Sequence, residues 1–361
     1  MFGWNPPLAA ARHLWGVAAA GIVGVSHFIG RHPRLILVPL SVAALLEMPG
    51  DARRISVRQA ARPHVTRSSV TLAYPPGFHL PPLRVKGKPP QSALVIKVGD
   101  AKPLYDLNGD EPRYPASTTK LMTLYLLFQE MKAGHISPDK MLTISPHADS
   151  MPPSILVVPG HKISAYNAAM TIITRSANNI AVAVGEAIAG SEPAFAVRMN
   201  ATAKKLGLRQ TFYFNASGLP DARRDNVTSA RDLATLAAAI ERDFPAYAKW
   251  FDTPVYTYFG TPIRNHNHLV GKDHITGMKT GFINKSGYNV VTSYEPPSGN
   301  KYIVVVIGSR SWVARDHTAI DLACKYIPEF AHNEAKACAT PETAVKPAPS
   351  AAPVPLTRLV R

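Results

Sequence analysis

The feature that most restricts how this chain can fold is a strongly apolar stretch that starts at Ser117 and ends near Lys132. It follows Pro115, a residue type that favours the start of a helix, and its length and spacing predict an α-helix. Its apolar side chains are too numerous for the single apolar face of a surface helix. We therefore predict a central helix buried on most sides, in which the apolar residues include Leu121, Leu124, Tyr125, Leu127 and Phe128.

β-like runs lie at both ends of the region that contains this helix. Two short runs come before it, at 93–98 and near Leu104, and two follow at 288–294 and 302–308, where the intervening PPSG sequence predicts a hairpin. We therefore expect a mixed α/β fold of the α+β type, in which strands from both ends complete an antiparallel sheet around an inserted helical region. Helical patterns cover residues 165–174, 178–189, 192–206, 230–242 and 315–330.

Three short motifs follow one another along this region: Ser117–Lys120 (STTK), Ser176–Asn178 (SAN) and Lys279–Gly281 (KTG). Each motif by itself is weak evidence, because patterns this short occur by chance in a chain of this length. All three in this order, spread over about one domain, indicate acyl transfer through a serine ester with lysine in the place of the usual histidine.

Ser117 and Lys120 are the predicted nucleophile and base. They are three residues apart, so a helix places both on one face. A lysine can accept the serine proton only when it is neutral, and burial together with a nearby cation such as Lys279 lowers its pKa. The alternative is a helix-capping serine and a surface lysine; it is disfavoured because the helix is apolar all round, which would leave Lys120 as an unexplained buried charge.

Ser176 and Asn178 fall between two helical patterns, on a loop or tight turn. The Ser176 hydroxyl could relay a proton between the lysine and the leaving group, and the Asn178 amide could hold a backbone carbonyl of the substrate. A plain helix cap before Ile180 would be the better explanation without the other two motifs.

The Lys279–Gly281 motif precedes the predicted hairpin and indicates an edge strand. Lys279 and Thr280 can bind a substrate carboxylate, while Gly281 allows the substrate backbone to approach closely. The backbone N–H groups of Ser117 and Phe282 are the candidates for an oxyanion hole.

Longer segments around these motifs carry a family resemblance: Pro115–Thr123 (PASTTKLMT), Arg175–Asn178 (RSAN), Asn215–Asp221 (NASGLPD), Gly277–Gly281 (GMKTG) and Ser286–Asn289 (SGYN). Together they resemble the serine D-alanyl-D-alanine carboxypeptidases, the low-molecular-weight penicillin-binding proteins. The resemblance covers essentially residues 92–330. It implies the penicillin-binding/β-lactamase fold, with a five-stranded antiparallel sheet flanked by helices and a helical subdomain.

The resemblance also implies an activity and further site residues. The implied reaction is removal of the terminal D-alanine from peptidoglycan pentapeptide stems, without a cofactor or metal, and β-lactams would acylate the same serine. Arg315 matches the family arginine that helps to hold the terminal carboxylate of the substrate, with Arg310 as a weaker candidate. The chain departs from the family at Asn179, where relatives commonly carry an aspartate.

Three other functions and a metal site are the alternatives. Class A β-lactamases carry Ser-Asp-Asn as the second motif and a deacylating glutamate in an E-x-x-L-N sequence. This chain has Ser-Ala-Asn instead and no clear E-x-x-L-N equivalent. A D,D-endopeptidase would use the same machinery on cross-linked peptidoglycan and stays open. A non-catalytic wall-binding or β-lactam-binding protein is disfavoured by the intact motifs. A metal site at His266, His268 and His274 is disfavoured because no carboxylate or cysteine partner has ligand spacing.

The ends of the chain differ in composition from the middle. Of the formal net charge of +16, much lies in the first 67 residues, which carry eight arginines against Glu47 and Asp51. This basic segment is either simply solvated or attracted to an anionic surface. Nucleic acid is not expected as a partner, because no recognised binding motif is present.

Two apolar stretches, Leu14–Gly30 and Leu35–Leu46, precede the catalytic region. Arg31 and Arg34 favour the cytoplasmic side, so the second stretch is the expected export segment. We therefore expect a leader or anchor at 1–52, an Arg- and Pro-rich linker at 53–91, the catalytic domain at 92–330 and an Ala- and Pro-rich disordered tail at 331–361. The predicted location is periplasmic or otherwise extracytoplasmic, and membrane contact through the N-terminus stays open.

Cys324 and Cys338 are the only cysteines. They could form a disulfide in an oxidising compartment, or be one buried thiol and one incidental thiol, and the sequence leaves both open.

Overall fold

The computed structural model describes residues 71–81, 91–152, 160–221 and 224–339. By its internal contacts the chain divides into two units, Met1–Arg67 and Ser68–Arg361. The first unit, which contains both predicted apolar stretches, lies outside the described residues.

A five-stranded antiparallel sheet in the order β2-β1-β9-β8-β7 forms one layer of this unit. Its strands come from both ends of the region, as the sequence predicts: β1 (Ser92–Lys97) and β2 (Tyr105–Leu107) from the first part, and β7 (Ile275–Ile283), β8 (Gly287–Tyr294) and β9 (Tyr302–Ser309) from the last. The hairpin of β8 and β9 is confirmed, and so is the edge position of β7.

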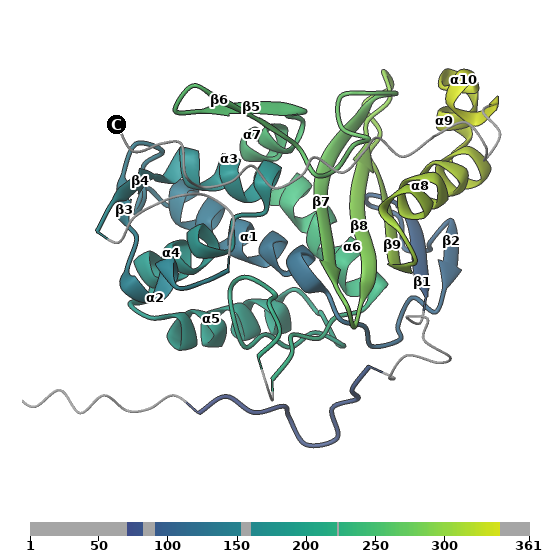
Figure 1. Cartoon of the computed structure of the whole chain (residues 1–361). Helices are drawn as coiled ribbons and strands as arrows, with labels where there is room; N and C mark the ends of the chain where they lie inside the picture. Colours follow the sequence, from purple (N-terminus) through teal and green to yellow (C-terminus); the bar gives the residue numbers. More distant parts are fainter. Residues whose placement is uncertain (1–70, 82–90, 153–159, 222–223, 340–361) are drawn as a thin grey trace, which may run out of the picture. The chain divides into compact units, whose positions relative to one another are not determined.

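Both faces of the sheet are buried, and successive residues along each strand point to opposite faces. On β9, Val304 and Val306 pack with α8 (Trp312–Tyr326) in one cluster, while Ile303 and Val305 belong to the larger cluster on the other face. Helix α6 (Ala230–Asp243) packs against this second face. Figure 1 shows α8 in front of the sheet and α6 behind it.

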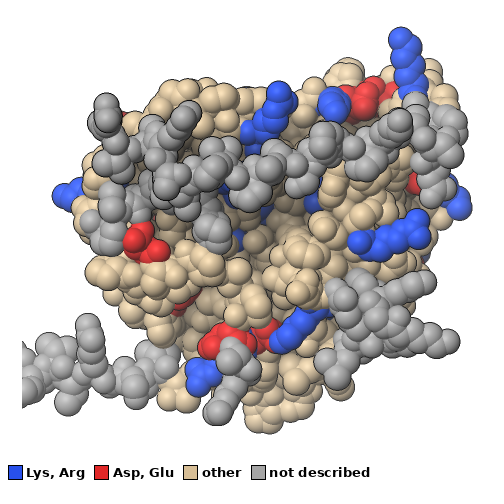
Figure 2. Space-filling model, viewed as in Figure 1, with Lys and Arg blue, Asp and Glu red and all other residues tan. Residues whose placement is uncertain are grey.

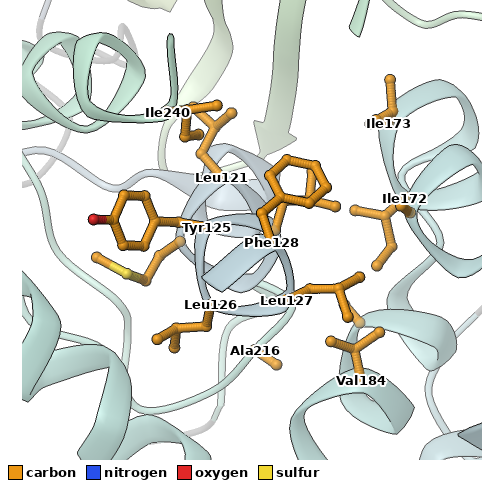
Figure 3. Close-up of a cluster of buried hydrophobic side chains, with 14 of the residues drawn as sticks. Leu121, Tyr125, Leu126, Leu127, Phe128, Ile172, Ile173, Val184, Ala216 and Ile240 are labelled. Atoms are coloured by element: carbon orange, nitrogen blue, oxygen red, sulfur yellow. The ribbon is translucent and has the colours of Figure 1, made fainter. Parts of the chain in front are cut away.

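Helix α1 (Lys120–Lys132) is the centre of the helical region. Leu121, Leu124, Leu127 and Phe128 have no measurable exposure, so the predicted buried helix is confirmed. Figure 3 shows side chains of other helices around it, including Ile240 of α6, Ile172 of α3 and Val184 of α4. The other helical elements are α2 (Pro146–Asp149), α3 (Ala165–Arg175), α4 (Asn178–Ala189), α5 (Glu192–Lys205), α7 (Pro245–Ala248), η3 (Lys249–Phe251), α9 (Pro328–Asn333) and α10 (Ala335–Ala339).

Ser117 lies outside the α-helix that was predicted to begin there. It belongs to a 3₁₀ turn, η2 (Ala116–Thr119), and α1 begins at Lys120. Ala116, with φ 50°, enters this turn in the left-handed region, so the chain arrives at the nucleophile from a direction that a continuous α-helix would not allow.

The C-terminal part also differs from the prediction of one helix at 315–330 and a disordered tail from 331. Helix α8 begins earlier, because Ser311 accepts a hydrogen bond from the Ala314 N–H and caps it. Residues up to Ala339 continue as α9 and α10. A disulfide between Cys324 and Cys338 joins α10 to α8, which resolves the two alternatives for the cysteines.

Part of the segment predicted to be a spacer packs on the domain. Residues 71–81 form no helix or strand, yet the Tyr74 ring stacks on Phe78 at 5.3 Å and meets Phe214 edge-on at 4.8 Å. The Tyr74 hydroxyl donates to the Asp225 carbonyl at 2.5 Å. Aromatic burial therefore holds this arm beside the loop that follows Phe212.

Two short hairpins were not predicted: β3 (Met141–Thr143) with β4 (Lys162–Ser164), and β5 (Val255–Tyr258) with β6 (Thr261–Arg264). Their strands are too short to show a clear alternating pattern. Within the described ranges, no single helix is long and apolar enough to cross a membrane; α4 and α5 pass that test only as a pair, and they meet at 81°.

Candidate active site

Lys120 and Ser117 form the centre of the site. The Lys120 side chain is fully buried, and its Nζ lies 3.0 Å from Ser117 Oγ. Two further oxygens contact the same nitrogen: Asn178 Oδ1 at 2.7 Å and the Ser217 carbonyl oxygen at 2.6 Å. Both of these oxygens can only accept hydrogen bonds. A neutral amine gives its two hydrogens to them and keeps its lone pair for the serine hydroxyl.

The surroundings of Lys120 favour this neutral form. Burial lowers the pKa of Lys120 well below its ordinary value, and the nearby positive charge of Lys279 lowers it further. The sequence analysis expected burial and Lys279 to lower this pKa, and both do so, as a lysine base requires.

The second motif places Ser176 and Asn178 at the junction of α3 and α4. Ser176 ends α3 in the left-handed conformation with φ 62°, and Asn178 is the first residue of α4. This sharp junction lets Asn178 reach Lys120, while the Asn178 Nδ2 donates to the Pro152 carbonyl at 2.8 Å. Ser176 Oγ is buried and has no hydrogen-bond partner among the described residues.

The third motif lies on β7, directly against the nucleophile turn. A Cβ atom at Gly281 would lie 2.8 Å from the Pro115 oxygen and 3.0 Å from the Ser117 nitrogen. Only glycine lets the strand come this close. Thr280 and Gly281 consequently line the same cleft as Ser117.

Lys279 and Arg315 add positive charge beside this strand. The Lys279 Nζ donates to the Thr280 carbonyl at 3.0 Å. Burial and the Arg315 guanidinium lower the pKa of Lys279 to about 7. Arg315, in the first turn of α8, is itself buried, and its Nε donates to Asp316 Oδ1 at 2.7 Å. The Arg315 guanidinium lies close enough to Lys279 to lower its pKa, and two neighbouring cations favour an added anion.

A cleft of about 380 Å³ brings the predicted residues together. It contains Ser117 and Arg315 with members of the second and third motifs; Figure 2 shows a hollow on this face, with Lys and Arg atoms visible in and around it. Lys120 and Lys279 lie buried beside it. The other predicted residues that line the cleft are Ser176, Asn178, Thr280, Gly281 and Phe282.

The cleft also contains residues that the sequence interpretation did not assign to it. His266 and His268, which were considered only as metal ligands, line it together with Arg175 and Trp312. Burial, followed by the charges of Lys279 and Arg175, lowers the pKa of His266 to about 3, so this histidine is neutral. In the sequence, the only indication that these histidines belong to the cleft is that Asn265–His268 (NHNH) lies shortly before the third motif.

The loop before α6 supplies the Ser217 carbonyl, and two asparagines hold it. Asn215 Oδ1 accepts hydrogen bonds from the Ser217 and Gly218 N–H groups at 3.2 and 2.7 Å. Asn226, which is buried, accepts a hydrogen bond from the Phe214 N–H and donates one to Thr119, the residue before Lys120. Sequence motifs report side chains, so this backbone contact to Lys120 could not be predicted from them.

Comparison with known proteins agrees with this geometry. The family model described as D-alanyl-D-alanine carboxypeptidase matches residues 87–311, which is more than half of the chain. The chain belongs to this family. The match includes all three motifs of the cleft and ends just before α8.

Two curated members of the family illustrate the similarity. The D-alanyl-D-alanine carboxypeptidase DacA of Haemophilus influenzae is 31% identical over 232 residues, which cover 63% of this chain and 58% of the relative. A D-alanyl-D-alanine endopeptidase of Pseudomonas aeruginosa is 33% identical over 209 residues, covering 55% and 65% of the two chains. The chain thus matches a little over half the length of the DacA proteins.

Solved structures of family members share the fold. Penicillin-binding protein 5 from Haemophilus influenzae aligns with a TM-score of 0.62 and 29% identity, over 69% of this chain and 72% of that one. Penicillin-binding protein D2 from Listeria monocytogenes, solved in the ampicillin-bound form, aligns with a TM-score of 0.56 and 26% identity, over 68% and 97%. The expected penicillin-binding fold with a five-stranded antiparallel sheet is therefore confirmed.

Proposed function

We propose that this protein is a serine D,D-carboxypeptidase that removes the terminal D-alanine from peptidoglycan pentapeptide stems. The observation that carries the proposal is the fully buried Lys120, whose Nζ lies 3.0 Å from Ser117 Oγ and whose pKa is lowered by burial and by Lys279. Family membership supports the substrate class.

Acylation begins with proton transfer from Ser117 Oγ to the neutral Lys120 Nζ. The Ser117 oxygen then attacks the carbonyl carbon of the penultimate D-alanine and forms a tetrahedral intermediate. The N–H groups of Ser117 and Phe282 are the proposed donors to its negative oxygen. The terminal carboxylate of the substrate binds at Thr280 and Arg315, next to the charge of Lys279.

Collapse of the intermediate requires a proton on the departing amine. Ser176 Oγ is the proposed relay, because it is buried near the cleft and has no other hydrogen-bond partner in the described part of the chain. D-Alanine then leaves, and water hydrolyses the ester on Ser117 to return the free serine. Asn178 holds Lys120 in place throughout.

β-Lactams are proposed to acylate the same serine, since their ring carbonyl and carboxylate would meet the same groups. Support comes from the ampicillin-bound Listeria relative. Export by the N-terminal segment, and action outside the cytoplasm, are likewise proposed from the substrate class and the apolar stretches in residues 1–52.

The test uses the purified full chain with pentapeptide monomers and with cross-linked dimers, and mass spectrometry of the products. Loss of one D-alanine from monomers, with dimers left intact, is the expected result. Cleavage of dimers instead would change the assignment to endopeptidase. No reaction with either substrate would contradict the proposal, and Ser117→Ala is the matched inactive control.

A further inference from the structure

The hairpin of β5 and β6 carries an uncharged aromatic surface that the catalytic cleft does not use. Its sequence from Val255 to Ile263, VYTYFGTPI, contains no charged residue. The Phe259 side chain at the tip is 88% exposed, the most of any large apolar residue in the described ranges, and Val255 is 45% exposed. Exposed apolar surface of this kind marks an interaction site.

The turn at the tip is an unusual place for phenylalanine. Phe259 and Gly260 have φ values of 46° and 75°, so both residues of the turn lie in the left-handed region. Hairpin turns of this geometry favour asparagine or glycine, and a bulky residue is disfavoured there. Phe259 opposes the local backbone preference and stays largely exposed, so the fold gains little from it, which indicates a role outside the fold.

Aromatic neighbours hold the tip in its projecting position. The Phe259 ring contacts Tyr258 at 4.6 Å, and the Tyr256 hydroxyl donates to Asn167 Oδ1 of α3 at 2.6 Å. Tyr166 meets Tyr256 at 6.3 Å. Tyrosine rings with one apolar body and one polar end suit the boundary between water and lipid.

Basic residues outnumber acidic ones around the hairpin, where Asp252 is the exposed acidic residue between Lys249 and Val255. Residues 253–272 contain no aspartate or glutamate, and Arg264 and Lys249 are exposed at the base of the hairpin. Basic side chains beside an apolar tip complement anionic lipid headgroups.

We propose that the β5–β6 hairpin is a membrane contact, in which Phe259 inserts into the interfacial region of an anionic bilayer and Arg264 and Lys249 contact its headgroups. The inference rests on the proposed location outside the cytoplasm. The hairpin lies close to the cleft in the chain, because Arg264 is followed by His266, which lines the cleft. Membrane contact at the hairpin would therefore set the height and orientation of the cleft relative to the bilayer.

The experiment places an environment-sensitive fluorophore at the hairpin tip of the full chain through Phe259→Cys. The native cysteines are paired in a disulfide and do not take the label. Vesicles of phosphatidylcholine with a minority of phosphatidylglycerol are added, some carrying nitroxide-labelled acyl chains. Lys102→Cys, at an exposed position outside the hairpin, carries the same fluorophore as the matched control.

The expected result is a several-fold rise of emission from the probe at position 259, with quenching by the nitroxide lipids, and little change at position 102. A chain that sediments with the vesicles but shows equal responses at the two positions overturns the proposal. A chain that does not sediment with them overturns it as well. A response to isolated peptidoglycan but not to vesicles would assign the hairpin to the wall instead.

A second variant tests the side chain itself. In the unlabelled full chain, Phe259→Trp should keep the contact and show a blue-shifted, lipid-quenched emission, relative to its own spectrum without vesicles. Phe259→Ser should lower the affinity for anionic vesicles several-fold. Penicillin labelling of Ser117 should be the same in both variants as in the unsubstituted chain. If the unsubstituted chain is not labelled by penicillin, the proposed enzyme function is contradicted, whereas the hairpin proposal is not affected.

Discussion

Three oxygens surround the Lys120 Nζ and fix its position. Asn178 Oδ1 and the Ser217 carbonyl take two hydrogens, and the third neighbour, Ser117 Oγ, carries the proton to be removed. A protonated Lys120 would place a charge in a fully buried position next to Lys279. The three oxygens therefore orient the lysine, while burial and the charge of Lys279 favour its neutral form.

Replacement of this lysine tests the base directly. Lys120→Ala should slow acylation by a fluorescent penicillin by about 100- to 10,000-fold, the usual contribution of a positioned general base. Lys132→Ala, on the exposed end of the same helix, should leave the rate unchanged. Acylation of Lys120→Ala at neutral pH within tenfold of the unsubstituted rate would require another base.

The dependence of activity on pH follows from Lys279. Its pKa is lowered to about 7, so it is charged below that pH and loses its attraction for the substrate carboxylate above it. We expect kcat/KM to fall as the pH rises through about 7, while protonation of Lys120 produces the decline at low pH. The pH profile of pentapeptide hydrolysis measures both limbs.

Arg315 supplies the charge that helps to lower this pKa. Removing a positive charge makes protonation of Lys279 easier, so Arg315→Ala should move the alkaline decline to higher pH, in addition to weakening substrate binding. An alkaline limb that stays in place or moves to lower pH would show that another group produces it.

At the level of elements, the site depends on how closely an edge strand approaches a turn. The free outer side of β7 faces the cleft, and Gly281 permits contact with the backbone of η2. Asn289 on β8 strengthens this approach, because its Nδ2 donates to the carbonyls of Tyr114 and Pro115 at 3.0 and 3.1 Å. The sheet and the nucleophile turn are thus joined by side chains as well as by packing.

Gly281→Ala should separate β7 from η2, because the added Cβ meets backbone atoms that cannot rotate away. A displacement of about 1 Å costs on the order of 100-fold in rate, and we expect acylation by penicillin to fall by about that factor. Gly281→Val should fall further. Thr276→Val on the same strand should leave acylation unchanged, and equal loss in both strand variants would point to general unfolding.

At the scale of the whole molecule, the disulfide extends the folded part beyond Phe330. It joins α8 to α10 across a sequence separation of 14 residues. A loop of this size, closed by a covalent link, stabilises a protein by about 3 kcal/mol through the lower entropy of the unfolded chain. An oxidising compartment, which the proposed location supplies, maintains such a bond.

Cys338→Ser should therefore lower the free energy of unfolding of the full chain by about 2–4 kcal/mol, measured by urea denaturation. Penicillin acylation of the folded protein should not change, because Arg315 lies in the first turn of α8 and Cys324 in its last part. An equal stability of the oxidised and reduced wild-type chain would contradict the stabilising role.

The order of the motifs and the spacing of apolar residues were enough to predict much of the fold and of the candidate site. The buried helix, the strands from both ends and the edge position of the third motif follow from residue pattern alone, because each has a long or chemically distinctive signal. The short hairpins, the 3₁₀ turn at Ser117 and the early start of α8 have weaker local signals. They depend on contacts with residues distant in sequence, as Tyr256 on β5 depends on Asn167.

The sequence by itself determined which residues are the candidates for the chemistry, because a serine, two lysines and an asparagine in this order have few other uses together. Only the tertiary structure decided the protonation states of these side chains and which atoms they contact. The pKa of Lys120 depends on complete burial and on Lys279, which is far away in the chain. The contact of the Ser217 carbonyl with Lys120 and the neutral state of His266 also depend on the tertiary structure. The reason is that desolvation and distance are properties of the packed molecule and not of its single residues.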